Sequence, residues 1–210
     1  MGEMSDESIY GENYETLDSL RREVLDSIEQ LRLGICEKTT FDPVEHCLSR
    51  IKAEESMREK CRRSNLPETS RSALVDIHDA IGLRVVCAFR SDVFLVRDHL
   101  ASLPGFEVVE EKDYIRKAKP NGYRSYHMIL RTNDGRAPSG CGETDGFYVE
   151  VQLRTISMDT WAALEHHMKY KKATPANERL IVSELKRCAD ELASTDLSMQ
   201  ALRDLILEEK

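Results

Sequence analysis

Long hydrophobic runs are absent from this chain of 210 residues. No stretch approaches the roughly 18 consecutive apolar residues that a membrane-spanning helix requires. The N-terminus is acidic and has no apolar segment of the kind found in secretory signals. We therefore expect neither a membrane span nor secretion, and a cytoplasmic location.

Closely spaced cysteines are also absent. The six cysteines stand at positions 36, 47, 61, 87, 141 and 188, and no two of them form a C-x-x-C pair. Because zinc sites and disulfide frameworks are built on such pairs, neither is expected. We interpret the cysteines as reduced thiols, which fits a cytoplasmic protein.

Positive charge is scarce in total but concentrated in two places. The formal net charge of −8 disfavours a general nucleic-acid binder, DNA included, because that affinity rests on a basic surface. Residues 50–63 nevertheless hold six basic and three acidic side chains, and residues 112–124 hold five basic and one acidic. Two local basic patches in an acidic protein suit a small polyanion better than a long one.

Hydrophobic periodicity predicts both helices and strands. Steps of three and four among the apolar residues of 17–35 predict an amphipathic helix, and the apolar run Ile81–Phe89 predicts a buried strand. Asp42 and Pro43 are typical of a helix N-cap and first turn, so a short helix is expected to about Leu48. The other expected elements are a short helix over 71–79, helices over 92–103 and 155–172, and strands over 106–109, 125–131 and 147–153.

The C-terminal segment carries a heptad pattern. From Ile181 to Ile206, apolar residues recur at alternating steps of four and three, with Thr195 as the weak point. A single helix lying on the core would satisfy this pattern. A seam of this length favours a hairpin of helices or a contact between subunits.

Residues 119–127 combine a turn with groups suited to a nucleotide. Residues 120–122 predict a turn that leads into a strand. Tyr123, Ser125 and His127 alternate, so a strand would place them on one face. The groups able to contact phosphate or a base are Lys119, Arg124, His127 and the ring of Tyr123. An ordinary hairpin turn with surface charges is the alternative.

Residues 50–60 form a second candidate site. Arg50 and Lys52 are two apart, as on one side of an extended segment. Ser56 and Lys60 are four apart, as on one side of a helix. An extended basic pair that leads into a helix N-terminus is suited to a phosphate. The alternative is a solvated, charged helix face.

Polar residues also mark two of the expected strands. Asp79 stands at the entrance of the buried strand and Arg84 lies inside it, where an arginine needs a partner. On the strand 147–153, Glu150 and Gln152 share one face with Arg154 just beyond it. That face is either exposed to solvent or part of a site.

Six motifs in this chain resemble the RelA/SpoT-type synthetase domain, and they stand in that family's order. They are Arg50-x-Lys52-x-x-x-Ser56-x-x-x-Lys60, Asp79-Ala-Ile-Gly-Leu-Arg84, Lys112-Asp113-Tyr114, Lys119-x-Asn121-Gly-Tyr-Arg-Ser-Tyr-His127, Glu150-Val-Gln-Leu-Arg-Thr155, and Trp161 followed by Glu165-His-x-x-Lys-Tyr170. Together they cover about residues 44–172. The short length and helical ends are similar to the stand-alone small alarmone synthetases.

The resemblance implies a fold and a reaction. The fold would be α+β, a mixed β-sheet flanked by helices and similar to nucleotidyltransferases. An N-terminal helical extension would occupy residues 1–43, the synthetase domain 44–173 and a C-terminal helical or oligomerisation segment 174–210. The reaction would be the transfer of the β,γ-diphosphate of ATP to the 3′-hydroxyl of GDP or GTP, giving (p)ppGpp and AMP.

The resemblance also implies roles for single residues. Asp79 and Glu150 would bind Mg²⁺, and Glu150 would accept the proton of the 3′-hydroxyl. Arg50 and Arg84 would enclose the adenine of ATP, while Tyr123 would stack on guanine. The ATP phosphates would be held by Lys52, Ser56 and Lys60. The acceptor nucleotide would further be bound by Lys119, Asn121, Arg124, His127 and Gln152.

Two other functions are open at this point. Some relatives of the small synthetases act as toxins on adenine nucleotides or tRNA 3′ ends, and a non-catalytic nucleotide-binding module is the other reading. The acidic total disfavours tRNA, and the presence of both Asp79 and Glu150 argues against a module that only binds. The heptad seam and the N-terminal helix favour a homo-oligomer, and the resemblance implies a tetramer as in small synthetases. Regulation by an alarmone or single-stranded RNA is left open.

Overall fold

The chain folds around one five-stranded mixed sheet. The computed structural model describes residues 8–39, 41–169 and 175–208. The strands are β1 (Val44–Ile51), β2 (Ile81–Cys87), β3 (Phe106–Asp113), β4 (Tyr126–Thr132) and β5 (Tyr148–Thr155), in the spatial order β1-β2-β5-β4-β3. β2 and β5 run parallel, and the other neighbouring strands are antiparallel. The α+β class and the mixed sheet expected from the sequence are confirmed.

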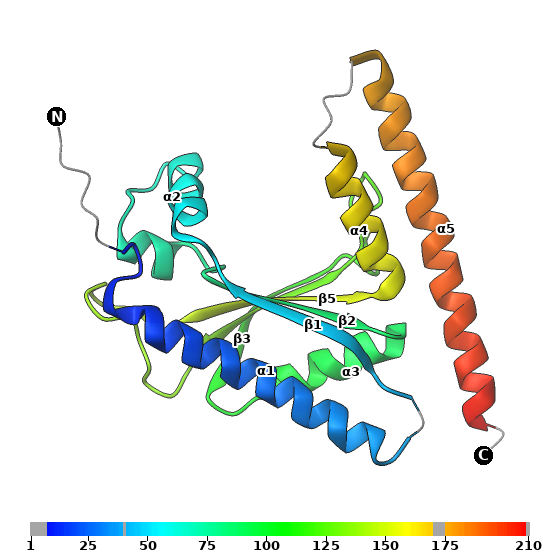
Figure 1. Ribbon diagram of the computed structural model, residues 1–210, viewed down its shortest axis with the longest axis horizontal. Coiled ribbons are helices and arrows are strands. Elements are labelled where there is room, and N and C mark those ends of the chain that lie inside the picture. The colour runs from blue at the N-terminus through cyan, green and yellow to red at the C-terminus, as the bar shows by residue number, and fades with distance from the viewer. Residues whose placement is uncertain (1–7, 40, 170–174, 209–210) are drawn as a thin grey trace.

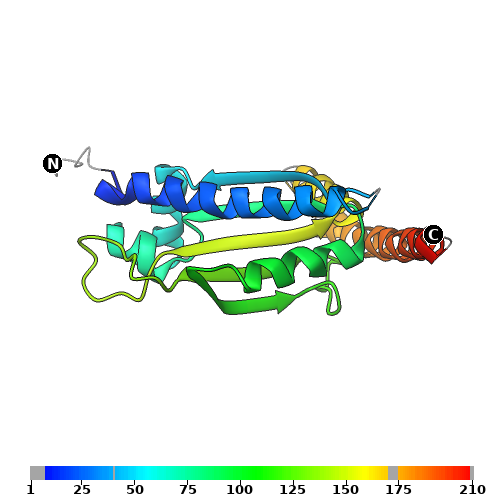
Figure 2. The same ribbon diagram turned by 90° about the horizontal axis from the view of Figure 1, so that it is seen from below.

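Helices cover one face of the sheet and flank the other. α1 (Tyr14–Cys36) and α3 (Arg90–Ala101) pack on one face, as Figure 2 shows. α2 (Glu54–Arg63) and α4 (Ile156–Lys169) stand at opposite ends of the other face, and α5 (Pro175–Glu208) runs along α4 (Figure 1). Two single turns, η1 (Gly11–Asn13) and η2 (Ser72–Asp76), complete the described elements. No helix in the described ranges is long and apolar enough to cross a membrane.

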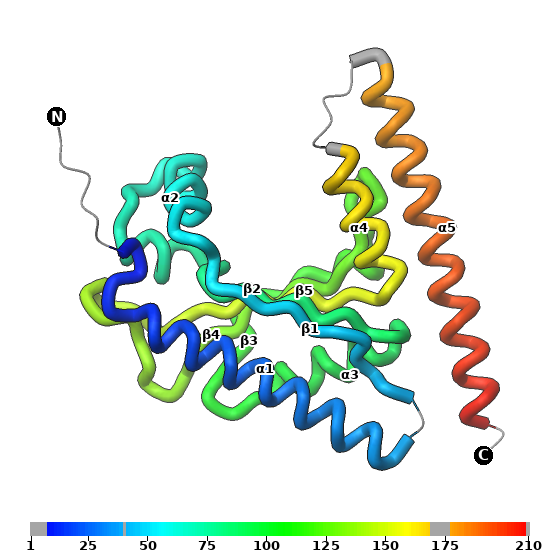
Figure 3. Tube along the Cα trace, in the orientation of Figure 1, coloured from blue at the N-terminus to red at the C-terminus, as the bar shows by residue number. Residues whose placement is uncertain are grey.

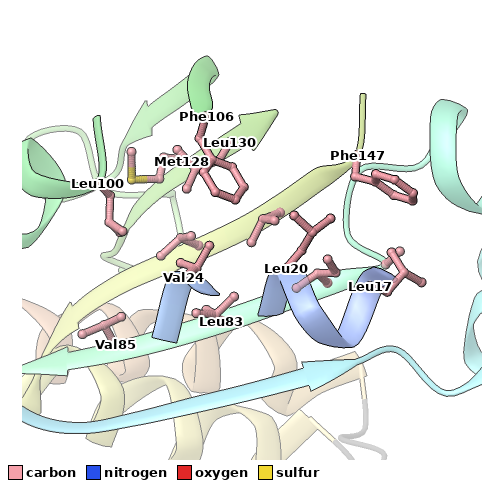
Figure 4. Packing of buried hydrophobic residues seen from close by; sticks show 14 of the residues in the cluster. Leu17, Leu20, Val24, Leu83, Val85, Leu100, Phe106, Met128, Leu130 and Phe147 are labelled. Atoms are coloured by element: carbon pink, nitrogen blue, oxygen red, sulfur yellow. The ribbon is translucent and has the colours of Figure 1, made fainter. Parts of the chain in front are cut away.

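The core lies between the sheet and the pair α1 and α3. Figure 4 shows Leu20 and Val24 of α1 directed at Leu83 of β2, with Met128 of β4 and Leu100 of α3 nearby; all five side chains are buried. Burying a side chain of this size contributes roughly 1.5–3 kcal/mol. Because strand side chains alternate between faces, this packing directs the intervening residues of β2, β4 and β5 to the opposite, open face.

The segment after Pro43 is a strand, and the short helix expected to about Leu48 is wrong. β1 pairs with β2 along its whole length, from Val44 opposite Cys87 to Ile51 opposite Ile81. The buried strand β2 needs hydrogen-bond partners on both edges, and β1 supplies the second edge. Asp42 does not cap a helix: its carboxylate accepts the N–H of Val44 at 3.0 Å.

The C-terminal heptad pattern belongs to one continuous helix, α5, whose first half pairs with α4. α5 is continuous over 34 residues, and the tube in Figure 3 shows its length beside α4. Leu185 and Ala189 are buried against Trp161 of α4. Met199 and Leu202, by contrast, are 52% and 53% exposed. The first half of the pattern therefore packs within the chain.

The boundaries of three other elements differ from expectation. The strand expected over 106–109 continues to Asp113 because β3 pairs with β4 as far as Tyr126. The helix expected over 71–79 is only the single turn η2. The helix expected over 155–172 is observed as α4, and its last three expected residues lie outside the described residues.

Candidate active site

Side chains from neighbouring strands meet on the open face of the sheet. Gly82 on β2 lies opposite Arg50 on β1 and opposite Glu150 on β5. The next outward pair is Arg84 with Gln152. These five residues line a hollow of about 240 Å³. Because a Cβ at Gly82 would meet nothing within 4 Å, the floor between the arginines and Glu150 is open.

Two lysines converge on Asp79 beside this hollow. Lys52 follows β1 and Lys60 lies on α2, and both ammonium groups contact Asp79 Oδ2, Lys60 at 2.6 Å. Burial opposes ionisation of Asp79, but the hydrogen bonds and charges of the two lysines outweigh it and lower the pKa of this carboxyl. Ser56 lies one turn before Lys60 and is exposed. The extended segment followed by a helix, predicted from the spacing of these residues, is confirmed.

Arg84 does not sit unpaired within its strand. Its side chain is 40% exposed, and its guanidinium lies 3.5 Å from Asp159 Oδ1 on α4. Burial and the nearby charge of Arg154 lower the pKa of Arg84. Arg84 and Arg50 both line the hollow, as the predicted adenine site requires.

The turn 119–123 lies at the other end of the open face. Its two backbone hydrogen bonds run from Gly122 N–H to the Lys119 carbonyl at 2.8 Å and from Lys119 N–H to the Tyr123 carbonyl at 3.1 Å. Gly122 has φ +95°, a conformation that side chains with a Cβ rarely adopt. A Cβ there would also come within 2.6 Å of Ala189 Cβ on α5. The turn is therefore fixed by close contact with the C-terminal helix.

Tyr123 and His127 lie together, but Ser125 does not join them. Tyr123 Oη is 2.8 Å from His127 Nε2. Ser125 is fully buried and its hydroxyl donates to the Leu153 carbonyl. The three residues do not share a strand face, because β4 begins only at Tyr126.

Positive charge gathers around the Tyr123 ring. Lys119 Nζ lies 4.9 Å from the ring centroid of Tyr123 and 4.6 Å from that of Tyr114. Burial, followed by the charges of Arg154 and Lys119, lowers the pKa of His127 to about 4. His127 is thus neutral at physiological pH.

Arg154 connects these groups and was missed as a site residue. It is 5% exposed, and its guanidinium donates to Gln152 Oε1 and Tyr123 Oη, each at 2.9 Å, and to Asp159 Oδ1 at 2.9 Å. Because a guanidinium only donates, the amide nitrogen of Gln152 is turned away from it. The sequence signal was the position of Arg154 on the same polar face as Glu150 and Gln152.

Two predicted acceptor ligands make hydrogen bonds within the protein. Asn121 Oδ1 accepts the N–H of Tyr123 at 3.2 Å, and its amide nitrogen donates to Glu165 Oε1 at 3.1 Å. Arg124 donates to the Ile115 carbonyl and to Asp190 Oδ1 on α5. Both side chains stabilise the turn and its contact with the C-terminal helices.

Comparison with known proteins finds a matching family and similar relatives. The family model described as a region found in RelA/SpoT proteins matches residues 49–175. The chain is 37% identical over 149 residues to GTP pyrophosphokinase YwaC of Bacillus subtilis, a match that covers 71% of this chain and 69% of the relative. It is 32% identical over 170 residues to GTP pyrophosphokinase YjbM of the same organism, covering 79% and 75%.

Solved structures agree with these matches. Small alarmone synthetase 1 of Bacillus subtilis bound to its product pppGpp has a TM-score of 0.74 at 27% identity, covering 91% of this chain and 95% of that chain. Small alarmone synthetase 2 of the same organism has a TM-score of 0.68 at 32% identity, covering 88% and 95%. The family resemblance carried by the six motifs is confirmed: this chain belongs to the RelA/SpoT synthetase family.

Proposed function

We propose that this protein transfers the β,γ-diphosphate of ATP to the 3′-hydroxyl of GDP or GTP, producing (p)ppGpp and AMP. One observation carries the proposal: two sets of cationic and polar side chains flank Glu150, one on β1, β2 and α2 and the other at the turn before β4. The names of the two Bacillus subtilis relatives and the product-bound synthetase structure support it.

The ATP side would be the hollow and the lysine pair. Arg50 and Arg84 line the hollow, and planar, weakly hydrated guanidinium groups stack well on adenine. Lys52 and Lys60 would exchange their contact with Asp79 for the phosphates of ATP, with exposed Ser56 nearby on α2. Catalysis of phosphoryl transfer consists mainly of positioning and charge neutralisation, which these cations would provide.

The acceptor side would be the turn 119–123. Tyr123 would stack on guanine, and Lys119 would meet the phosphates of the acceptor. Because Lys119 now lies over the Tyr123 ring, a stacking base would share the ring with this ammonium group or displace it. Gln152 Oε1 accepts from Arg154, so Gln152 would use its amide nitrogen as a hydrogen-bond donor to the acceptor nucleotide.

Mg²⁺ would fit the carboxylates Asp79 and Glu150. Across the described ranges, no three His, Cys, Asp or Glu side chains gather into a closed metal cage. Mg²⁺ needs none, because it is usually bound by one or two carboxylates together with phosphates and water. Asp79 Oδ1 is buried without a hydrogen-bond partner, which is uncommon for a carboxylate oxygen and supports a ligand role. The ion would neutralise charge on the reacting phosphates.

Glu150 would accept the proton of the attacking 3′-hydroxyl. It is positioned between the two nucleotide sets, and general-base assistance contributes roughly 10²–10⁴-fold. The test is incubation with Mg²⁺, γ-labelled ATP and GDP, GTP, GMP or tRNA in separate reactions, with Glu150→Gln as the control. Label in a guanosine tetra- or pentaphosphate, absent with the folded variant, is expected. Label only on tRNA or an adenine nucleotide, or none with ATP intact, would contradict the proposal.

The second half of α5 would associate with another copy of the chain. Met199, Leu202 and Ile206 continue the heptad pattern and are each about half exposed, at 52%, 53% and 50%. An apolar seam of this kind is typical of a helix that packs against another helix. Light scattering should therefore give the mass of an oligomer, and a tetramer is the expectation taken from small synthetases. A monomer at micromolar concentration would contradict it.

A further inference from the structure

Four side chains on the open face lie in a row, and the first three are joined by hydrogen bonds. Arg154 donates to Tyr123 Oη at 2.9 Å, and Tyr123 Oη lies 2.8 Å from His127 Nε2. On the other side of the imidazole ring, His127 Nδ1 faces Glu150 Oε1 at 4.0 Å. That last distance exceeds a hydrogen bond, and a closure of about 1 Å would form one. The chain thus leads from the acceptor turn to the carboxylate between the two nucleotide sets.

The two ends of this chain fix the direction of every bond in it. Arg154 has only donors, so Tyr123 Oη accepts from it and keeps its own proton available for His127 Nε2. Glu150, as a carboxylate, has only acceptors, so His127 can approach it only with an N–H at Nδ1. Both constraints select the same neutral tautomer of His127, with the proton on Nδ1 and a lone pair on Nε2.

We propose that His127 is a positioning residue for Glu150: its Nδ1–H, set by Tyr123 and Arg154, orients the carboxylate that receives the proton of the acceptor hydroxyl. The inference rests on the role proposed above for Glu150. It differs from a phosphate-binding role for His127, because the two ring nitrogens face Tyr123 Oη and Glu150 Oε1.

The chain also assigns a second task to Tyr123. Its ring is the proposed stacking surface, and its hydroxyl sets the tautomer of His127. The two tasks are separable, because phenylalanine keeps the ring and removes the hydroxyl. Tyr123→Phe should therefore retain the KM for the guanine nucleotide and lower kcat.

Two amide substitutions separate the nitrogens of His127. Asparagine places its amide near the Nδ1 position, where it can donate toward Glu150, whereas glutamine places its amide near Nε2. We expect His127→Gln to lower kcat by about tenfold or more, with a change in the guanine-nucleotide KM of less than about threefold. His127→Asn should restore a large part of that loss. Far-UV circular dichroism and thermal melting check that each variant is folded. If one His127 variant is not folded, the kcat and KM of Tyr123→Phe test the proposal in its place.

A spectroscopic measurement tests the chain without the reaction. Nitrogen-15 NMR of the free protein should show His127 as the neutral tautomer protonated on Nδ1, and Tyr123→Phe should change that tautomer ratio. A His127 ring protonated on Nε2 would overturn the proposal. It would also be overturned if His127→Gln and His127→Asn lowered kcat equally and their KM for the guanine nucleotide depended on its number of 5′-phosphates. If the wild-type protein shows the expected tautomer but makes no guanosine polyphosphate, the proposed function fails while the hydrogen-bond chain stands.

Discussion

Lowering the pH should destabilise this protein through His127. The effect should begin at a higher pH than the protonation of the protein's carboxylates. In the folded protein the pKa of His127 is lowered to about 4, first by burial and then by neighbouring cations. An unfolded chain binds the proton near the ordinary value of about 6.5. Between these two values the unfolded state therefore holds more protons than the folded state, so stability falls as the pH falls.

The size of the effect follows from the two pKa values. At pH 5 most unfolded chains carry the proton on this residue and few folded ones do, which corresponds to a loss of about 2 kcal/mol relative to pH 7.5. The imidazole is only 18% exposed, so solvent screens its surroundings little. The charged and titratable groups that face it are Arg154 and Glu150 on β5, Lys119 and Tyr123 in the turn, Lys112 and Glu110 on β3, and Tyr114 just after β3.

The assay compares urea unfolding of the wild-type protein with His127→Asn, which cannot titrate at this position. Other groups titrate in both proteins and largely cancel in the difference between their unfolding free energies. That difference should shift against the wild type by about 2 kcal/mol between pH 7.5 and pH 5. A difference that is constant across this range would show that His127 is not held neutral in the folded state, and the electrostatic reasoning would fail.

Two further substitutions have matched controls. Gly122→Ala should destabilise the protein by roughly 1–3 kcal/mol in urea unfolding, because the new Cβ would meet Ala189. The control is Gly135→Ala, which has a similar φ of +89° but nothing within 4 Å of its Cβ, so it carries only the backbone strain. Equal losses of unfolding free energy in the two variants would exclude the contact with α5 as the cause. Arg203→Met should cost roughly 3–5 kcal/mol, because it leaves the 2% exposed carboxylate of Asp92 without its 2.6 Å partner. Arg187→Met on the same helix removes only exposed pairs and should change stability by less than about 1 kcal/mol.

Sequence patterns predicted the elements whose burial is local. α1 was predicted because its apolar residues repeat at the helical period, and β2 because a continuous apolar run indicates a strand buried on both faces. β1 was not, because Asp42 and Pro43 are equally compatible with the start of a helix. The pairing of β1 with β2, across some 30 residues of chain, decided the conformation, and no local pattern records such pairing.

The candidate site was predicted in its residue types more completely than in its contacts. The motifs identified Arg50, Arg84 and Glu150, and the structure places all three around one hollow. They did not indicate that Asn121 and Arg124 are engaged in holding the turn. The sequence names a side chain but not its hydrogen-bond partner, and in a network the partner determines whether the group is available to a ligand.

The heptad pattern of α5 shows what periodicity can and cannot establish. A repeat of seven indicates that one face of a helix is covered, but it does not distinguish a partner in the same chain from one in another. In this helix the answer changes along its length: Leu185 and Ala189 are buried against α4 and the Gly122 turn, whereas Leu202 is exposed. The buried part follows from geometry, since the missing Cβ of Gly122 leaves room for Ala189 of α5. Trp161 of α4 donates to the Leu185 carbonyl of α5 at 2.8 Å. Gly122 therefore serves the packing of α5 as well as the turn, and the sequence motif alone shows only the turn.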